Sequence, residues 1–133
     1  MSRREPIWLS RLAVDEAHVR QIREHGGPRG IRDEGALEAA LARPRHRWSY
    51  EPSARWSDLA AAYGFGIVQG HPFVDGNKRV GLVAMVAFLY RNGLELMASD
   101  AQVVSWILAV AAGRMAEAEL AALVEVHVRP DVP

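Results

Sequence analysis

Apolar residues recur with a helical period along most of this 133-residue chain, and turn-forming Gly, Pro and Asn residues separate the periodic segments. Strand signals are weak, and we expect only "HRWSY", residues 46–50, to form a short extended piece. The pattern therefore predicts an all-α bundle in a single domain over residues 1–133. The expected helices span residues 15–25, 33–43, 57–69, 77–91, 100–112 and 115–127.

Capping residues mark several of the expected helix ends. Asp33 and Ser57 are expected N-caps, and Pro44 is expected to end the second helix. The pair Asn92-Gly93 supplies a left-handed C-cap after the fourth helix. These residues predict short connections between consecutive helices.

The fourth segment, residues 77–91, is apolar on every face, which predicts a central helix that is packed all round. In the helix before it, Gly64 and Gly66 either weaken the helix or allow another helix to approach closely. We therefore expect about six helices around one buried helix.

A dense polar stretch, "GHPFVDGNKR" at residues 70–79, lies directly before this apolar helix. Pro72 disfavours the α conformation at His71, and the next helix begins near Asn77. The intervening loop opens onto a helix N-terminus, where unpaired N–H groups and the positive dipole end favour an anion such as phosphate. Gly76 lets the backbone approach a ligand closely or adopt a positive φ.

Two cationic residues follow in the first helical turn. Asn77, Lys78 and Arg79 are candidate phosphate ligands, and Arg79 can clamp phosphate oxygens with its planar fork. Cations here oppose the helix dipole, so a purely structural helix would not favour them. Lys78 is also the only lysine among the sixteen basic residues. The alternative for Arg79 is a surface ion pair.

The loop also carries an acid and a base. Asp75 would repel a phosphate unless a cation lies between them, and Mg²⁺ bound by one carboxylate and phosphate oxygens meets that need. His71 carries an imidazole, which can take a proton from an attacking hydroxyl. Phe73 is expected to point inward and anchor the loop. Taken singly, Asp75 is better explained as an N-cap, and His71 as a structural loop residue.

Composition narrows the possible functions. Sixteen acidic residues balance sixteen basic ones, which disfavours a nucleic-acid partner. The chain has no cysteine, so disulfides and thiolate metal sites are excluded. We see no apolar run of signal-peptide or membrane-spanning length, and we expect a cytoplasmic protein with no membrane contact.

The stretch "HPFVDGNKR" resembles the signature of the Fic/death-on-curing superfamily, H-x-F-x-[DE]-[GA]-N-[GK]-R, and the likeness covers most of residues 7–125. The resemblance implies a helical Fic fold with a short flap and a nucleotide-dependent protein transferase that uses ATP and Mg²⁺. It assigns the general base to His71 and the metal carboxylate to Asp75. The implied phosphate-binding residues are Gly76, Asn77, Lys78 and Arg79.

Two departures favour the death-on-curing toxin branch. Adenylylating Fic enzymes carry glycine where this chain has Lys78, and a second arginine where it has Leu82. The resemblance then implies transfer of the γ-phosphate of ATP to a threonine of elongation factor Tu, which stops translation. Val83 stands where some members of that branch carry asparagine. The alternatives are transfer of AMP and a catalytically inactive binding module.

A toxin of this branch needs an inhibitor. The superfamily's inhibitory motif, [ST]-x-x-x-E-[GN], has its only partial match at Glu34-Gly35, and Gly30 stands where Ser or Thr is required. The resemblance therefore implies a separate antitoxin, whose disordered tail folds on the toxin.

Arginine and aromatic residues alternate in "RPRHRWSYEPSARW", residues 43–56. This segment is a single-stranded nucleic-acid site, a solvated connection whose tryptophans cap the core, or the family's flap. We favour the flap, which would hold an extended target segment beside His71 through Arg47, Trp48, Ser49 and Tyr50. Outside this segment, we interpret His18 and His25 as a surface pair and Trp106 as a core residue.

Overall fold

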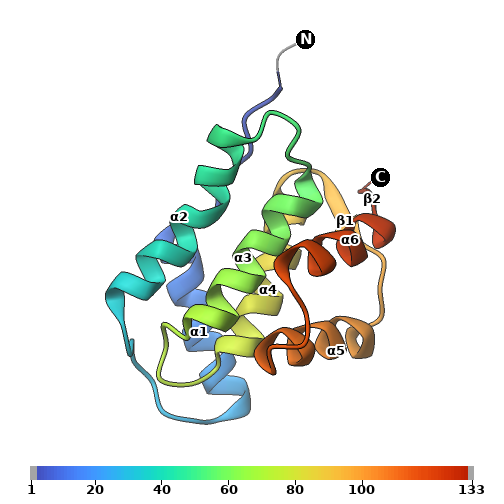
Figure 1. Cartoon of the computed structure of the whole chain (residues 1–133). Coiled ribbons are helices and arrows are strands. Elements are labelled where there is room, and N and C mark those ends of the chain that lie inside the picture. The colour runs from blue at the N-terminus through green and yellow to red at the C-terminus, as the bar shows by residue number, and fades with distance from the viewer. Residues whose placement is uncertain (1–2, 132–133) are drawn as a thin grey trace.

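A computed structural model describes residues 3–131 and shows six helices and one antiparallel pair of short strands. In Figure 1, α3 lies between α2 and α6, with α4 behind it. The predicted all-α fold is confirmed. In chain order the elements are α1 (Arg11–His25), α2 (Glu34–Tyr50), α3 (Trp56–Gly70), α4 (Asn77–Arg91), β1 (Leu94–Leu96), α5 (Asp100–Ala111), α6 (Glu117–His127) and β2 (Val128–Pro130).

The helix at the centre is α3 rather than the predicted segment 77–91. Helix α3 packs against α2, α4, α5 and α6, and its residues 60–63 are fully buried. Helix α4 leaves Val86 and Tyr90 exposed, at 39% and 65% of their surface. The prediction weighed apolar content alone. Helix α3 is central because its small Ala and Gly residues allow the neighbouring helices to pack closely against it.

Two glycines allow the close contact between α3 and α4. A Cβ on Gly64 would lie 2.6 Å from Met85 Cγ, and one on Gly81 would lie 2.7 Å from Val68 Cγ2. The close approach expected at Gly64 is confirmed. This crossing fixes how the loop between the two helices is presented.

We predict that Gly81→Ala destabilises the protein by about 1–3 kcal/mol, because the added methyl group overpacks the α3–α4 contact. Urea unfolding measures the change. Gly35→Ala, where the nearest atom is 3.4 Å away, is the matched control and should be neutral or slightly stabilising. Equal stability of the two variants would contradict this account of the crossing.

Side-chain caps place two helix starts differently from the prediction. Helix α1 begins at Arg11, before the expected residue 15, because Ser10 Oγ accepts a hydrogen bond from the Ala13 N–H at 3.0 Å. Ser57 is not the cap of α3. Its hydroxyl is buried without a partner, and the Asp58 carboxylate instead accepts the Arg55 N–H at 2.8 Å.

The other predicted caps are confirmed. Asp33 accepts a hydrogen bond from the Ala36 N–H at 3.0 Å at the start of α2. Gly93 has a φ of 79° after α4, as expected for a left-handed C-terminal position.

Helix α2 continues through Pro44 to Tyr50, so the predicted helix end and the extended piece at residues 46–50 are both wrong. Pro44 is buried inside the helix, where it removes one backbone hydrogen bond. Tertiary contacts offset that loss. Arg43 and Arg47 bind the two carboxylate oxygens of Glu117, at 2.6 and 3.0 Å, and tie this half of α2 to α6.

We predict an acid-sensitive contribution to stability from Asp58. Burial by itself raises the pKa of this carboxyl, but hydrogen bonds from Arg55 and the nearby Arg47 outweigh burial and hold the pKa below its usual value of 3.8. A lowered folded-state pKa gives stability that is present above pH 3.8 and is lost as the pH falls through the folded value.

Asp58→Asn should therefore cost about 1–2 kcal/mol at pH 7. The difference from wild type should shrink toward pH 3, because protonation then removes the same charge from the wild-type side chain. Denaturant unfolding at both pH values measures it. A difference that stays constant would contradict the assigned ion pairs.

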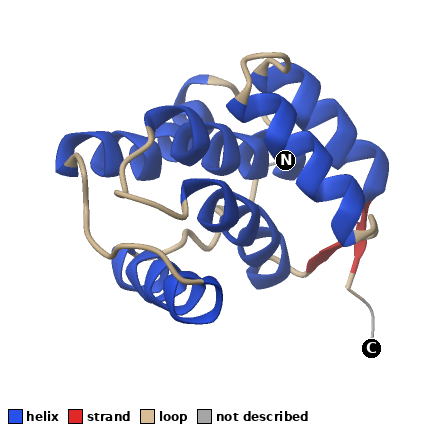
Figure 2. Cartoon of the chain, turned by 90° about the horizontal axis from the view of Figure 1, so that it is seen from below, coloured by secondary structure: helices blue, strands red, loops and turns tan. Residues whose placement is uncertain are grey.

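Strands β1 and β2 pair with Leu96 opposite Val128 and lie at one edge of the molecule (Figure 2). The weak strand signals of the sequence did not identify them. Among residues 3–131, no helix is long and apolar enough to cross a bilayer.

Candidate active site

A hollow of about 350 Å³ opens where α3 passes into α4. The polar loop between the helices and the first turn of α4 form most of it. Val68 of α3 and Ala111 of α5 supply apolar wall. The predicted site residues that line the hollow are His71, Asp75, Gly76, Asn77, Lys78 and Arg79. The structure thus brings six of the predicted residues together.

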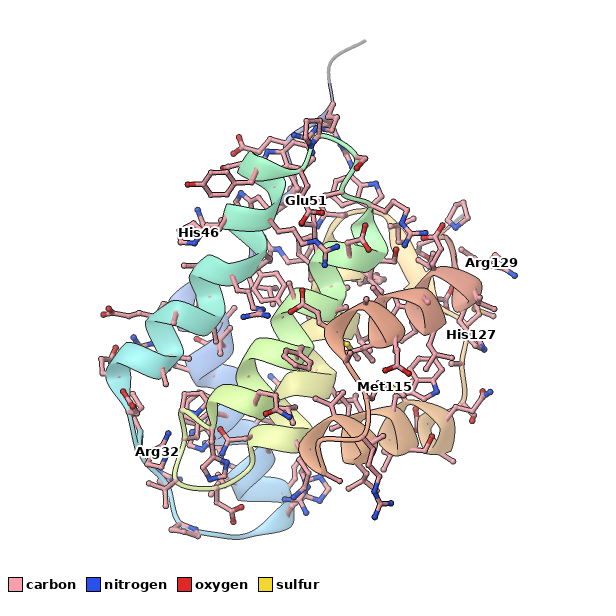
Figure 3. All side chains as sticks on the ribbon, viewed as in Figure 1. Arg32, His46, Glu51, Met115, His127 and Arg129 are labelled. Atoms are coloured by element: carbon pink, nitrogen blue, oxygen red, sulfur yellow. The ribbon has the colours of Figure 1, made fainter. Side chains whose placement is uncertain are left out.

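His71 ends α3 in the left-handed conformation, with φ and ψ both at 51°, and its side chain is exposed. Arg32 supports this conformation. Its Nε donates to the His71 carbonyl at 2.6 Å and its Nη2 to the Gly70 carbonyl at 3.1 Å. Arg32 lies beside the loop in Figure 3. The sequence does not identify Arg32 as a site residue, since nothing in the local pattern around it indicates this contact.

Phe73 is fully buried, as predicted, and Asn77 holds its backbone. Asn77 Oδ1 accepts the Phe73 N–H, and Asn77 Nδ2 donates to the Phe73 carbonyl, both at 2.9 Å. The same Nδ2 lies 3.0 Å from His71 Nδ1. The buried Asn77 side chain is therefore hydrogen-bonded within the loop. Its role as a phosphate ligand stays a prediction.

The contacts of Asn77 also set the tautomer of His71. The two bonds to Phe73 fix which end of the amide carries the hydrogens, so an N–H of Asn77 faces His71 Nδ1. His71 Nδ1 therefore accepts, and the neutral ring carries its own proton at Nε2.

Asp75 and Gly76 form the entrance to α4. Gly76 occupies the N-cap position with a φ of 83°, and no side chain caps the helix. Asp75 is exposed, and its Oδ1 accepts the Gly76 N–H at 2.8 Å, so the N-cap interpretation of Asp75 is wrong. A Cβ on Gly27, in the turn after α1, would overlap the Asp75 carboxylate.

Among the described residues, no three His, Asp or Glu side chains are grouped to hold a metal ion. Mg²⁺ commonly binds through one or two carboxylates together with substrate phosphates. The exposed Asp75 beside the hollow fits that mode. It does not fit a metal cage built from protein alone.

Lys78 and Arg79 are exposed in the first turn of α4, and within residues 3–131 neither forms an ion pair. Their charges add to the positive end of the helix dipole. Glu34, from the partial inhibitory motif, instead bonds to Arg11 of α1, and that bond lowers the Glu34 pKa. Within residues 3–131, the start of α4 thus carries two cationic side chains that form no ion pair with an acidic side chain.

The segment predicted as a flap lies elsewhere. Arg47, Trp48, Ser49 and Tyr50 form the end of α2, and Arg47 pairs with Asp58 at the start of α3. His71 follows the other end of α3, about 22 Å away at 1.5 Å per helical residue. Residues 47–50 therefore do not flank His71, because α2 runs antiparallel to α3 and is longer than predicted.

Residues 30–32 lie beside the loop instead. Ile31 and Phe73 form an isolated antiparallel bridge. The Arg32 N–H donates to the Pro72 carbonyl at 2.7 Å, and the Val74 N–H donates to the Gly30 carbonyl at 3.0 Å. This short extended stretch precedes α2, where the helical pattern lapses.

The expected surface pair of histidines is also wrong. His18 is only 4% exposed, and its ring stacks on Phe73 with centroids 4.0 Å apart, whereas His25 is exposed. The predicted core position of Trp106 is confirmed, at 7% exposure.

The helical fold and the loop that places His71 beside the cationic start of α4 indicate the family to which the protein belongs. The family description "Fic/DOC family" matches residues 8–89, more than half of the chain, and the chain belongs to that family. Within it, the chain is similar to "Protein kinase doc" of Escherichia phage P1, with 35% identity over 82 residues, 62% of this chain and 65% of the relative.

The chain is also similar to "Toxin Doc" of Mycolicibacterium smegmatis, with 40% identity over 74 residues, 55% of this chain and 57% of the relative. It spans less than two thirds of the length of each of these curated relatives. The resemblance to the Fic/death-on-curing superfamily, toxin branch, is confirmed.

Proposed function

We propose that this protein is a Doc-type toxin that transfers the γ-phosphate of ATP to a Ser or Thr hydroxyl of a translation protein. By family resemblance, the proposed target is elongation factor Tu. One observation carries the proposal. The exposed imidazole of His71 and the exposed cations Lys78 and Arg79 line one hollow at the start of α4. The names of the two relatives agree with it.

The start of α4 provides the phosphate site. Backbone N–H groups of the first turn lack helical partners, and the left-handed Gly76 leaves the approach to them open. Lys78 and Arg79 add positive charge where the phosphate chain would lie. Asp75 would hold Mg²⁺, which would supply charge neutralisation during transfer.

His71 takes the proton in this proposal. The target oxygen forms a bond to the γ-phosphorus, the bond from that phosphorus to the bridging oxygen of ADP breaks, and the hydroxyl proton goes to the imidazole. In the resting loop Nδ1 is engaged by Asn77 and Nε2 is protonated. Either ring nitrogen can accept a proton only after the bond to Asn77 is exchanged, so we propose that target binding releases the ring.

Residues 30–32 are the proposed contact for the target. This stretch is extended and lies against the loop that carries His71. Ile31 is 40% exposed there, which offers an apolar contact next to the reacting hydroxyl. The assignment replaces the one made for residues 47–50.

The direction of ATP binding decides between phosphate and AMP transfer. Lys78 replaces the glycine of adenylylating relatives, and its side chain stands exposed at the hollow. Leu82 replaces their second arginine and is half-buried. Both features favour kinase activity. We also propose cytoplasmic action and a separate antitoxin, as the toxin name of the second relative suggests.

The deciding assay supplies the purified protein with a cytoplasmic extract, Mg²⁺ and ATP labelled at either the α or the γ phosphorus. Label transferred to protein only from the γ position supports the kinase. Label from the α position would replace it by adenylyl transfer. No transfer from either position, with antitoxin absent, would favour a catalytically inactive binding module.

A further inference from the structure

A buried histidine of α1 contacts the loop of the proposed site. His18 is 4% exposed and lies 57 residues from Asp75 in sequence, yet its Nε2 is 3.1 Å from the Asp75 carbonyl oxygen. We infer that His18 is a positioning residue, which sets the register of the loop and, through it, of the acid and the base of the site. The activity arm of its test rests on the proposed function.

The first contact has a defined polarity. A carbonyl oxygen only accepts hydrogen bonds, so His18 Nε2 carries the proton and donates. This bond ties the main chain of Asp75 to α1, while Asp75 also lines the hollow. The carboxylate, whose Oδ1 accepts the Gly76 N–H, still has lone pairs for a ligand, while the backbone of Asp75 is tied to α1.

The second contact is a stack. The rings of His18 and Phe73 are nearly parallel, with an angle of 10° between their planes. The main chain of Phe73 in turn forms two hydrogen bonds with the side-chain amide of Asn77, which also contacts His71. One imidazole of α1 thus touches the segment that orients His71 as well as the segment that carries Asp75.

The turn at Gly76 lies over the same face of α1, where an added Cβ would be in van der Waals contact with it. A Cβ on Gly76 would lie 3.4 Å from Ile22 Cδ1 and 3.7 Å from His18 Cδ2. Ile22 follows His18 by one helical turn and is also buried. The turn at Gly76 therefore packs on the face of α1 that His18 and Ile22 form.

Two substitutions separate the two contacts. His18→Phe keeps an aromatic ring against Phe73 but removes the donor to Asp75, and His18→Gln keeps an N–H donor but removes the ring. The control is His25→Gln, an exposed histidine on the same helix. Transfer from γ-labelled ATP is measured per folded molecule, together with amide hydrogen exchange of residues 73–80 and of the core helix α3.

We expect His18→Phe to lower kcat by about 10–100-fold, as is typical when a second layer of contacts around a site is removed. His18→Gln should retain more activity than His18→Phe, and His25→Gln should match wild type. In His18→Phe, the amides of residues 73–80 should exchange faster while those of α3 keep their rates. This local change is one that general destabilisation would not produce.

Two results would overturn the inference. One is a His18→Phe protein with wild-type kcat per folded molecule and wild-type loop exchange. The other is exchange that rises equally in the loop and in α3, which would assign His18 to stability alone. If the wild-type protein transfers no label, the proposed function fails, and the exchange measurement still decides the role of His18.

Discussion

Replacing His71 with alanine is expected to lower the transfer rate by at least about 100-fold, because a positioned general base commonly contributes 10²–10⁴-fold. The fold should be retained, since the His71 side chain is exposed and its main chain stays held by Arg32. The rate is measured with γ-labelled ATP, and the fold by circular dichroism and thermal unfolding.

The left-handed backbone at His71 calls for a second variant. Asparagine tolerates that conformation better than alanine does, so His71→Asn separates loss of the base from backbone strain. Both variants should be inactive, and expression of either should leave growth unaffected where wild type slows it. Transfer at the wild-type rate in either variant would remove His71 from its proposed role.

Asn77→Ala is expected to have the second largest effect, on stability as well as on activity. It leaves the buried N–H and carbonyl of Phe73 without partners, at a cost of about 1–3 kcal/mol. It also removes the contact that orients the His71 ring until target binding releases it, and we expect a loss of about 10–100-fold in transfer rate per folded molecule. Denaturant unfolding and single-turnover rates measure the two effects.

Asn77→Asp provides the matched comparison. Its carboxylate still accepts from the Phe73 N–H but can only accept at His71, which favours a proton on Nδ1 and an unprotonated Nε2. We expect this variant to transfer faster than Asn77→Ala, and nitrogen NMR of His71 should show the change of tautomer. A wild-type rate per folded molecule in Asn77→Ala would contradict the positioning role.

Local patterns predicted the site well where neighbours in sequence are neighbours in space. Residues from His71 to Arg79 form a loop and one helical turn, and the turn chemistry of Pro72 and Gly76 is local. The hollow lined by His71, Asp75 and the first turn of α4 follows from that order alone. The polar lining of the hollow could therefore be predicted from the sequence alone.

Contacts between distant segments explain the errors. Pro44 stays helical because Arg43 and Arg47 bind Glu117, more than 65 residues away. Residues 47–50 lie away from His71 because α2 extends past Pro44, and residues 30–32 lie beside the loop instead. A helical period reports the burial of a face but does not name the partner that covers it.

By itself the sequence determined the helical class, the short loop before residue 77 and the polar cluster at the start of α4, because capping, turn formation and apolar period act over a few positions. Only the tertiary structure decided that α3 is the central helix, that Arg32 and Asn77 hold His71, and that His18 is buried under the loop. These contacts join residues that are distant in the chain, or they depend on side-chain orientations that only the folded structure sets.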